Sequence, residues 1–170
     1  MQEEIPIDII RIGETRFEVR DELFRPDSDK IRYFIEHQMG FNTDVNWVRF
    51  KVRIFYVYPE NLKDIVMDII VETIFHIPDL KQYVTTDTGP VTSADMNIPS
   101  KILVRFADMG ISHARAILAK CKAKSAFEDI NLPYIDAARS AKAFFGSKIE
   151  IEEEKTIVSD GKEENQNANG

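Results

Sequence analysis

Alternation with a period of two over residues 48–56 constrains the fold most strongly. Arg49, Lys51 and Arg53 lie between the apolar residues Val48, Phe50, Val52 and Ile54, and Tyr56 continues the apolar side beyond Phe55. A repeat of two residues is typical of a strand with one buried face and one solvated face. The stretch therefore predicts a half-buried strand of a sheet.

Three further stretches predict strands. Residues 31–41 place apolar side chains on one side, and residues 65–77 form a longer strand that ends before Pro78. Residues 5–19 are also extended, but their alternation shifts phase at Ile9 and Ile10, which indicates a bulge near Gly13. Turn-forming residues at 25–30, 42–46 and 59–63 connect these stretches. Four consecutive strands joined by turns predict an antiparallel meander.

The fourth stretch differs from the others because both of its sides carry apolar residues. One side holds Ile65, Met67, Ile69 and Val71, and the other mixes Val66, Ile70 and Ile74 with Asp68 and Glu72. A sheet face of this kind is seldom left bare. We therefore expect a loop, a partner subunit or a ligand to cover part of it.

Residues 99–125 predict a long helix behind Pro99, with Ser100 as its capping residue and lysines near its end. Its apolar face includes the small residues Ala107, Gly110 and Ala114, which would let the helix pack on the sheet and on a second copy of itself. Residues 130–136 are extended, and Asp136 would cap a short helix that ends at Gly146. The fold class is α+β, a four-stranded antiparallel sheet followed by a long and a short helix.

The long connection at residues 81–98 suggests a working segment or a short irregular helix, and Gly89 with Pro90 indicates a turn. With 170 residues and 44% hydrophobic content, the chain can form one domain over residues 1–146. Residues 147–170 predict an acidic, largely disordered tail, whose seven acids and three lysines give -4 of the net charge of -7.

This acidic balance argues against nucleic-acid binding. The N-terminus is acidic, no stretch is apolar enough to insert into a membrane, and Cys121 is the single cysteine. We therefore expect a cytoplasmic protein.

A search for catalytic chemistry is negative. His37, His76 and His113 lack partners at metal-ligand spacing, and Cys121 lies at the wrong end of a helix to be a stabilised thiolate. We expect no enzyme activity, no metal and no cofactor. Asp64, Asp68 and Glu72 are interpreted as solvent-facing acids. The row of Arg49, Lys51 and Arg53 is either the solvated side of a strand or a contact for an acidic partner.

Three strings carry a resemblance to a known family. These are IIRIGETRFEVRD at residues 9–21, DIIVETIFHIPDL at 68–80 and PSKILVRFADMGISHARAILAKCKAKSAFEDINLPYID at 99–136. With the order of strands, long helix, Leu-Pro segment and second helix, they resemble the SecB family of export chaperones over residues 5–146.

The resemblance implies an ATP-independent holdase that keeps unfolded or precursor proteins in apolar surface grooves and delivers them for export. It places the client-binding groove at Phe24, Ile65, Met67, Ile69, Val71, Tyr134, Phe144 and Phe145. An equally weighted interpretation makes residues 65–71 part of the core face of the sheet. The alternative function is a SecB-like interaction module with one specific partner, such as an antitoxin chaperone.

The family's contact surface for the SecA translocase motor maps onto Glu14, Glu18, Asp21, Val66 and Asp68. The end of the tail, SDGKEENQNANG, lacks a clear form of the family's motor-docking motif. The family also implies a homotetramer with sheets paired across subunits. In this interpretation Phe106, Gly110 and Ala114 form an interface between long helices.

Overall fold

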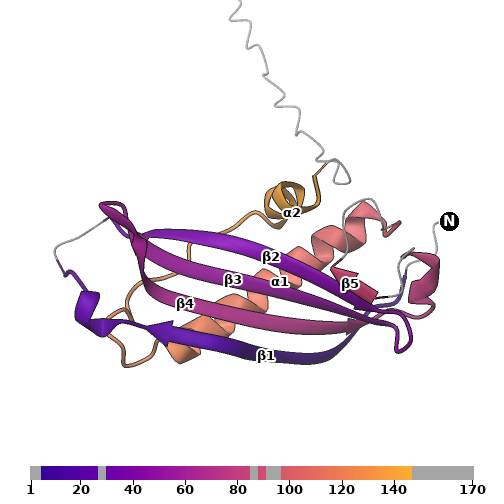
Figure 1. Ribbon diagram of the computed structural model, residues 1–170, viewed down its shortest axis with the longest axis horizontal. Coiled ribbons are helices and arrows are strands. Elements are labelled where there is room, and N and C mark those ends of the chain that lie inside the picture. Colours follow the sequence, from indigo (N-terminus) through magenta and orange to yellow (C-terminus); the bar gives the residue numbers. More distant parts are fainter. Residues whose placement is uncertain (1–4, 27–29, 85–87, 91–96, 147–170) are drawn as a thin grey trace, which may run out of the picture.

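The predicted strands form one antiparallel sheet with both helices on the same side (Figure 1). The computed structural model describes residues 5–26, 30–84, 88–90 and 97–146. The strands are β1 (Asp8–Val19), β2 (Arg32–Asn42), β3 (Trp47–Tyr58) and β4 (Asn61–His76). The helices are α1 (Ser100–Cys121) and α2 (Ala137–Phe145). The predicted α+β fold is confirmed.

The order of the strands corrects the predicted meander. Strands β2, β3 and β4 follow one another through short turns, but β1 pairs with β4, so the order is β1-β4-β3-β2-β5. Residues 20–31, which include the 3-10 turn η1 (Asp21–Leu23), carry the chain from one edge of the sheet to the other. That distance is three strand spacings, about 14 Å, which twelve residues span easily. The result is a Greek key, in which β4 is an inner strand.

The predicted bulge in β1 is present, although Gly13 does not form it. The pairing of β1 with β4 shifts register between Ile9 and Arg11 and again between Glu14 and Arg16. Gly13 lies between these two irregularities and pairs with Glu72. The phase shift read in the sequence at Ile9 and Ile10 is therefore the first of two bulges.

Helix α1 crosses the sheet diagonally and packs on the inward-facing residues of β3 and β4 (Figure 1). The ring centroids of Phe106 and Phe75 lie 4.6 Å apart. A Cβ atom at Gly110 would lie 2.8 Å from Cδ1 of Phe50, so only glycine permits this close approach. Helix α1 begins one residue earlier than predicted, because Pro99 and not Ser100 is the N-cap.

The predicted interface between long helices is wrong. Phe106, Gly110 and Ala114 are buried within one chain, because they face its own sheet. A second copy therefore cannot reach them in the folded state. The other part of the prediction, packing of the small residues on the sheet, is confirmed, since Gly110 lies against Phe50 and Val52 of β3.

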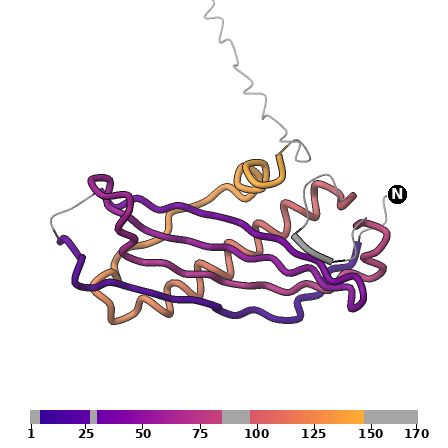
Figure 2. The backbone as a smooth tube through the Cα atoms, viewed as in Figure 1, coloured from indigo at the N-terminus to yellow at the C-terminus, as the bar shows by residue number. Residues whose placement is uncertain are grey.

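Helix α2 lies beside the β2 edge, and the segment before it runs back along the sheet (Figures 1 and 2). The predicted cap is confirmed, since Asp136 accepts a hydrogen bond of 2.9 Å from the Arg139 amide. Gly146 ends the helix with a φ of 64°. His37 of β2 and Ser140 of α2 share a hydrogen bond of 2.7 Å, which fixes the helix against the sheet.

The long connection contains a second 3-10 turn, η2 (Leu80–Gln82), and a short strand, β5 (Thr88–Pro90). The predicted turn at Gly89 and Pro90 is therefore wrong, because both residues pair with β2. Residues 85–87 and 91–96 and the predicted tail at 147–170 lie outside the described residues, so the domain boundary stays a prediction. Within the described ranges, no helix is long and apolar enough to cross a membrane.

Candidate functional site

Aromatic side chains remain exposed where the β2 edge meets helix α2 and the segment that leads to it. Tyr134 is 85% exposed, and Tyr33 and Phe144 are each 38% exposed. Ile35 and Ile135 are half-buried and pack against the core. We call these five residues the edge surface. Large apolar side chains gathered at one place on a protein surface commonly mark a binding site for another chain.

Contacts beneath the edge surface bring its three segments together. The Tyr33 ring lies 6.3 Å from the ring of buried Tyr56. Arg115 of α1 donates a hydrogen bond of 2.9 Å to the Pro133 carbonyl, which positions the neighbouring Tyr134. At the α2 end, the rings of Phe144 and His37 lie 5.6 Å apart.

Strand β2 also offers hydrogen-bonding groups of its main chain. Strand β5 pairs only with Gly40, Phe41 and Asn42, so no described strand covers residues 32–39 on that edge. The outward amide and carbonyl groups of such an edge can bind an extended peptide as an added strand. The edge surface therefore combines apolar side chains with unpaired strand backbone.

Two buried polar atoms lie close to this surface and have no hydrogen-bond partner among the described residues. They are Nδ1 of His37 and the hydroxyl of Tyr56. Burial lowers the pKa of His37 to about 4. Burial, together with Tyr33, raises the pKa of Tyr56 to about 12. Both side chains are thus neutral at pH 7, and an unpaired buried polar atom costs about 1–3 kcal/mol.

For Met67, Ile69 and Val71 the structure agrees with the core-face interpretation and not with the predicted client groove. These side chains are buried in the hydrophobic core, because α1 packs on this face of β4. Phe145 is also buried, and half-buried Phe24 packs edge-on against Phe127 with ring centroids 5.1 Å apart.

Four residues of the predicted groove keep accessible surface, namely Tyr134, Phe144 and half-buried Phe24 and Ile65. Sequence reasoning missed Tyr33 and Ile35. Their alternation was visible, but their position at an edge depends on which strands pair.

The predicted motor-binding residues do not form one surface. Val66 is part of the buried core, and Asp68 is only 2% exposed. Glu14 accepts a hydrogen bond from Cys121 of α1, whereas Glu18 pairs with Arg16 and Asp21 accepts from the Ala126 amide.

Asp68 was predicted to face solvent, but two arginines enclose it. Arg53 donates two hydrogen bonds of 2.9 Å to its carboxylate, and a nitrogen of Arg16 lies 3.6 Å away. Arg53 also bonds Glu36 of β2 at 3.0 Å. Charged side chains thus bridge all four long strands on the face opposite α1, which we call the open face. The predicted solvated row of Arg49, Lys51 and Arg53 lies on this face.

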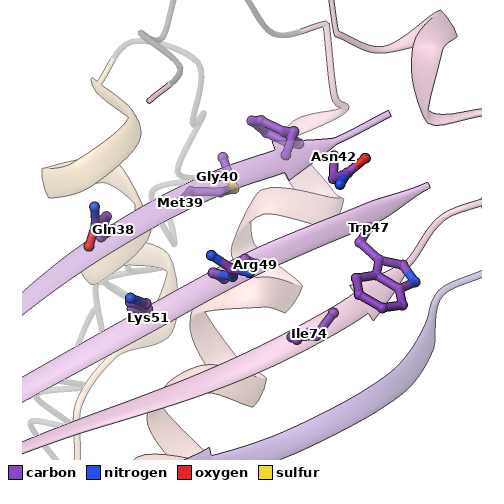
Figure 3. A pocket seen from close by; sticks show the side chains of 9 residues that line it. Gln38, Met39, Gly40, Asn42, Trp47, Arg49, Lys51 and Ile74 are labelled. Carbon is purple, nitrogen blue, oxygen red and sulfur yellow. The ribbon is translucent and has the colours of Figure 1, made fainter. Parts of the chain in front are cut away.

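A pocket of about 430 Å³ opens at one end of the open face (Figure 3). Arg49 and Lys51 point into it from β3, beside Trp47 and Gln38, while Ile74 of β4 forms part of its floor. Both cations pair with a single carboxylate, that of Glu72, at 3.3 and 3.7 Å.

The described residues offer little for catalysis. Burial and the neighbouring Glu14 carboxylate raise the pKa of Cys121 to about 11, so the thiol is protonated at pH 7. His113 bonds Thr73 at 3.0 Å. No group of three histidine, cysteine, aspartate or glutamate side chains is placed to hold a metal ion in the part of the chain that the structure describes.

No protein-family model and no curated protein sequence matches the chain. Among solved structures, one match is a SecB-like chaperone from Mycobacterium tuberculosis, in complex with a ChAD peptide from the HigA1 antitoxin. It has a TM-score of 0.46 and 11% identity, covering 76% of this chain and 90% of that one. Another is a protein of unknown function from Streptococcus agalactiae, with a TM-score of 0.35 and 7% identity, covering 78% and 97%.

Proposed function

We propose that this protein is an ATP-independent holdase that binds unfolded protein chains on the edge surface. The observation that carries the proposal is the exposure of Tyr33, Tyr134 and Phe144 beside an unpaired length of β2. Apolar contact is not directional, so such a surface accepts many sequences. The backbone of β2 adds hydrogen bonds that any extended client can make.

The sequence resemblance supplies the finer part of the proposal. It implies that the clients are precursor proteins and that a translocase motor receives them for export. Glu18 and Asp21 stay exposed near the end of β1 and are the acids on which we propose that a basic partner docks. Acidic side chains of this kind would contribute to association rate and orientation more than to affinity.

The test is suppression of aggregation of a slow-folding protein by the edge-surface variant Tyr134→Ser/Phe144→Ser. Losing contact with one large apolar side chain costs about 1.5–3 kcal/mol, so we expect at least a tenfold higher chaperone concentration for half-suppression. Leu62→Ser is the matched control, because Leu62 is an exposed apolar residue outside the edge surface. Both variants should keep the circular dichroism spectrum of the wild type.

Equal suppression by the edge-surface variant and the control would contradict the proposed site. No suppression by the wild type at stoichiometric excess would contradict a general holdase. If a pull-down then recovered one protein instead of many unfolded chains, the chain would be an interaction module with a dedicated partner.

A further inference from the structure

The pocket on the open face has an unbalanced charge. Arg49 and Lys51 both point into it and share the single Glu72 carboxylate, which leaves one positive charge in excess. No acidic residue is among the described residues that line it. Trp47 and Ile74 add apolar surface beside the cations (Figure 3). The chemistry of the lining thus fits a segment that alternates carboxylates with aliphatic side chains.

The described part of the chain ends close to this pocket, on the other side of the sheet. Phe145 stacks on Phe50 with ring centroids 6.4 Å apart, and Phe50 lies between Arg49 and Lys51 in β3. Neighbouring residues of a strand face opposite sides, so Phe50 lies behind the pocket that Arg49 and Lys51 line. Phe145 stacks on Phe50 and therefore also lies behind the pocket, and Gly146 is the next residue. To go from Gly146 to the pocket on the other side of the sheet, the chain would have to go around β2 and no other described strand, because β5 pairs only with residues 40–42 of β2.

The next residues have the composition that the pocket requires. Residues 147–154 read SKIEIEEE, with four glutamates, two isoleucines and one lysine. Six extended residues span about 20 Å, and packed layers lie about 10 Å apart, so this segment is long enough to pass around β2 and enter the pocket.

We propose that residues 147–154 dock in this pocket of the same chain. Carboxylates from Glu150, Glu152, Glu153 and Glu154 would face Arg49 and Lys51, and an isoleucine would cover Trp47 and Ile74. The docked segment would neutralise the excess charge of the pocket. This inference does not depend on the proposed holdase function.

The sequence provides its own reporter, because Trp47 is the single tryptophan and lines the pocket. Acrylamide quenching of the full-length protein should increase about twofold when Glu152, Glu153 and Glu154 are all replaced by glutamine. The matched control replaces Asp160 with asparagine and Glu163 and Glu164 with glutamine, which removes the same charge further along the chain. The control should quench like the wild type. Equal quenching of all three proteins would overturn the proposal.

A zero-length carbodiimide crosslink provides a second readout, because it joins a carboxylate directly to a lysine amine. We expect peptides that link Lys51 to a glutamate within residues 150–154, with a yield that does not change with protein concentration. Lys51→Arg keeps the charge but cannot react in this way, so the link should disappear. Links from Lys51 to Glu72 alone would overturn the proposal. Links found only in covalent dimers would do so as well, because they would place a second copy's segment in the pocket.

Discussion

At the scale of single residues, His37 shows how burial sets the chemistry of the edge surface. Its ring stacks on Phe50 at 5.4 Å and meets Phe144 edge-on, while Ser140 provides its one described hydrogen bond. A charged imidazolium is poorly solvated in such a site, so burial lowers the pKa of His37 from 6.5 to about 4. Protonation therefore opposes the packing of α2 on β2.

We predict that His37 makes the protein less stable in weak acid. Because its folded-state pKa is lower than its unfolded-state pKa, only the unfolded chain binds the proton between pH 6.5 and 4. Its contribution is complete above pH 6.5 and falls as the pH drops towards 4, by up to about 3 kcal/mol. Urea unfolding of the wild type and His37→Gln at pH 7.5 and 5 measures this difference.

The variant should lose less stability than the wild type between these two pH values. His76→Gln is the control, since His76 lies at the far end of β4, near Asp8. His113, whose pKa is also lowered by burial, remains in all three proteins. An identical pH dependence for the wild type and His37→Gln would contradict the prediction.

Asp68 illustrates the limit of reading charge from sequence. Its neighbours in β4 predict an acid on the solvated face of the sheet, and Asp68 does lie on the open face, opposite α1. Its burial arises from Arg16 in β1 and Arg53 in β3, which converge on it from both sides. No local pattern in β4 contains that information, because it depends on which strands flank β4.

At the scale of elements, Gly110 determines how closely α1 approaches the sheet. The sequence identified it as a point of close approach, but the contact is with β3 of the same chain. An added Cβ would meet Phe50 at 2.8 Å and Val52 at 2.9 Å. Those side chains belong to the fully buried core and have little room to move.

We therefore predict that Gly110→Ala destabilises the fold. Overpacking costs about 1–3 kcal/mol, and the better helix propensity of alanine returns up to about 1 kcal/mol. The net loss in free energy of unfolding should be about 1–2 kcal/mol in urea titrations. Gly40→Ala is the control because a Cβ there has no atom within 4 Å. A Gly110→Ala protein as stable as the wild type would show that α1 can shift away from β3 freely.

Element by element, the strands and helices could be predicted from the sequence because their periodicity is local. The pairing of β1 could not be predicted, since a connection of twelve residues allows β1 to lie beside either β2 or β4. That uncertainty decides which strands form the edges of the sheet. In a meander β4 would be an edge, whereas here β1 covers it and β2 becomes the exposed edge. Tyr134 and Phe144 were named from the family resemblance, and no local pattern in the sequence indicated their exposure.

At the scale of the whole molecule, the sheet has a second edge without a described neighbour. Strand β1 pairs with β4 on one side only, and Ile9, Ile10 and Ile12 are exposed along it. Long apolar edges are uncommon in monomers, because they invite pairing with another chain. Since α1 buries its small-residue face internally, β1 is now the better candidate for the contact between copies that the resemblance implies.

We predict that the protein assembles through β1 edges and that Ile10→Lys/Ile12→Lys disrupts the assembly. Charged side chains on an edge strand oppose pairing, while the core under α1 stays unchanged. Light scattering after size exclusion should give the wild type a mass of about 78 kDa, four times the 19.6 kDa of the chain, and the variant a smaller multiple. Leu62→Lys places a charge on an exposed apolar residue away from this edge and should keep the wild-type mass. A wild type that elutes as a monomer at micromolar concentration would exclude the β1 contact. A variant that keeps the wild-type mass would place the contact on another surface.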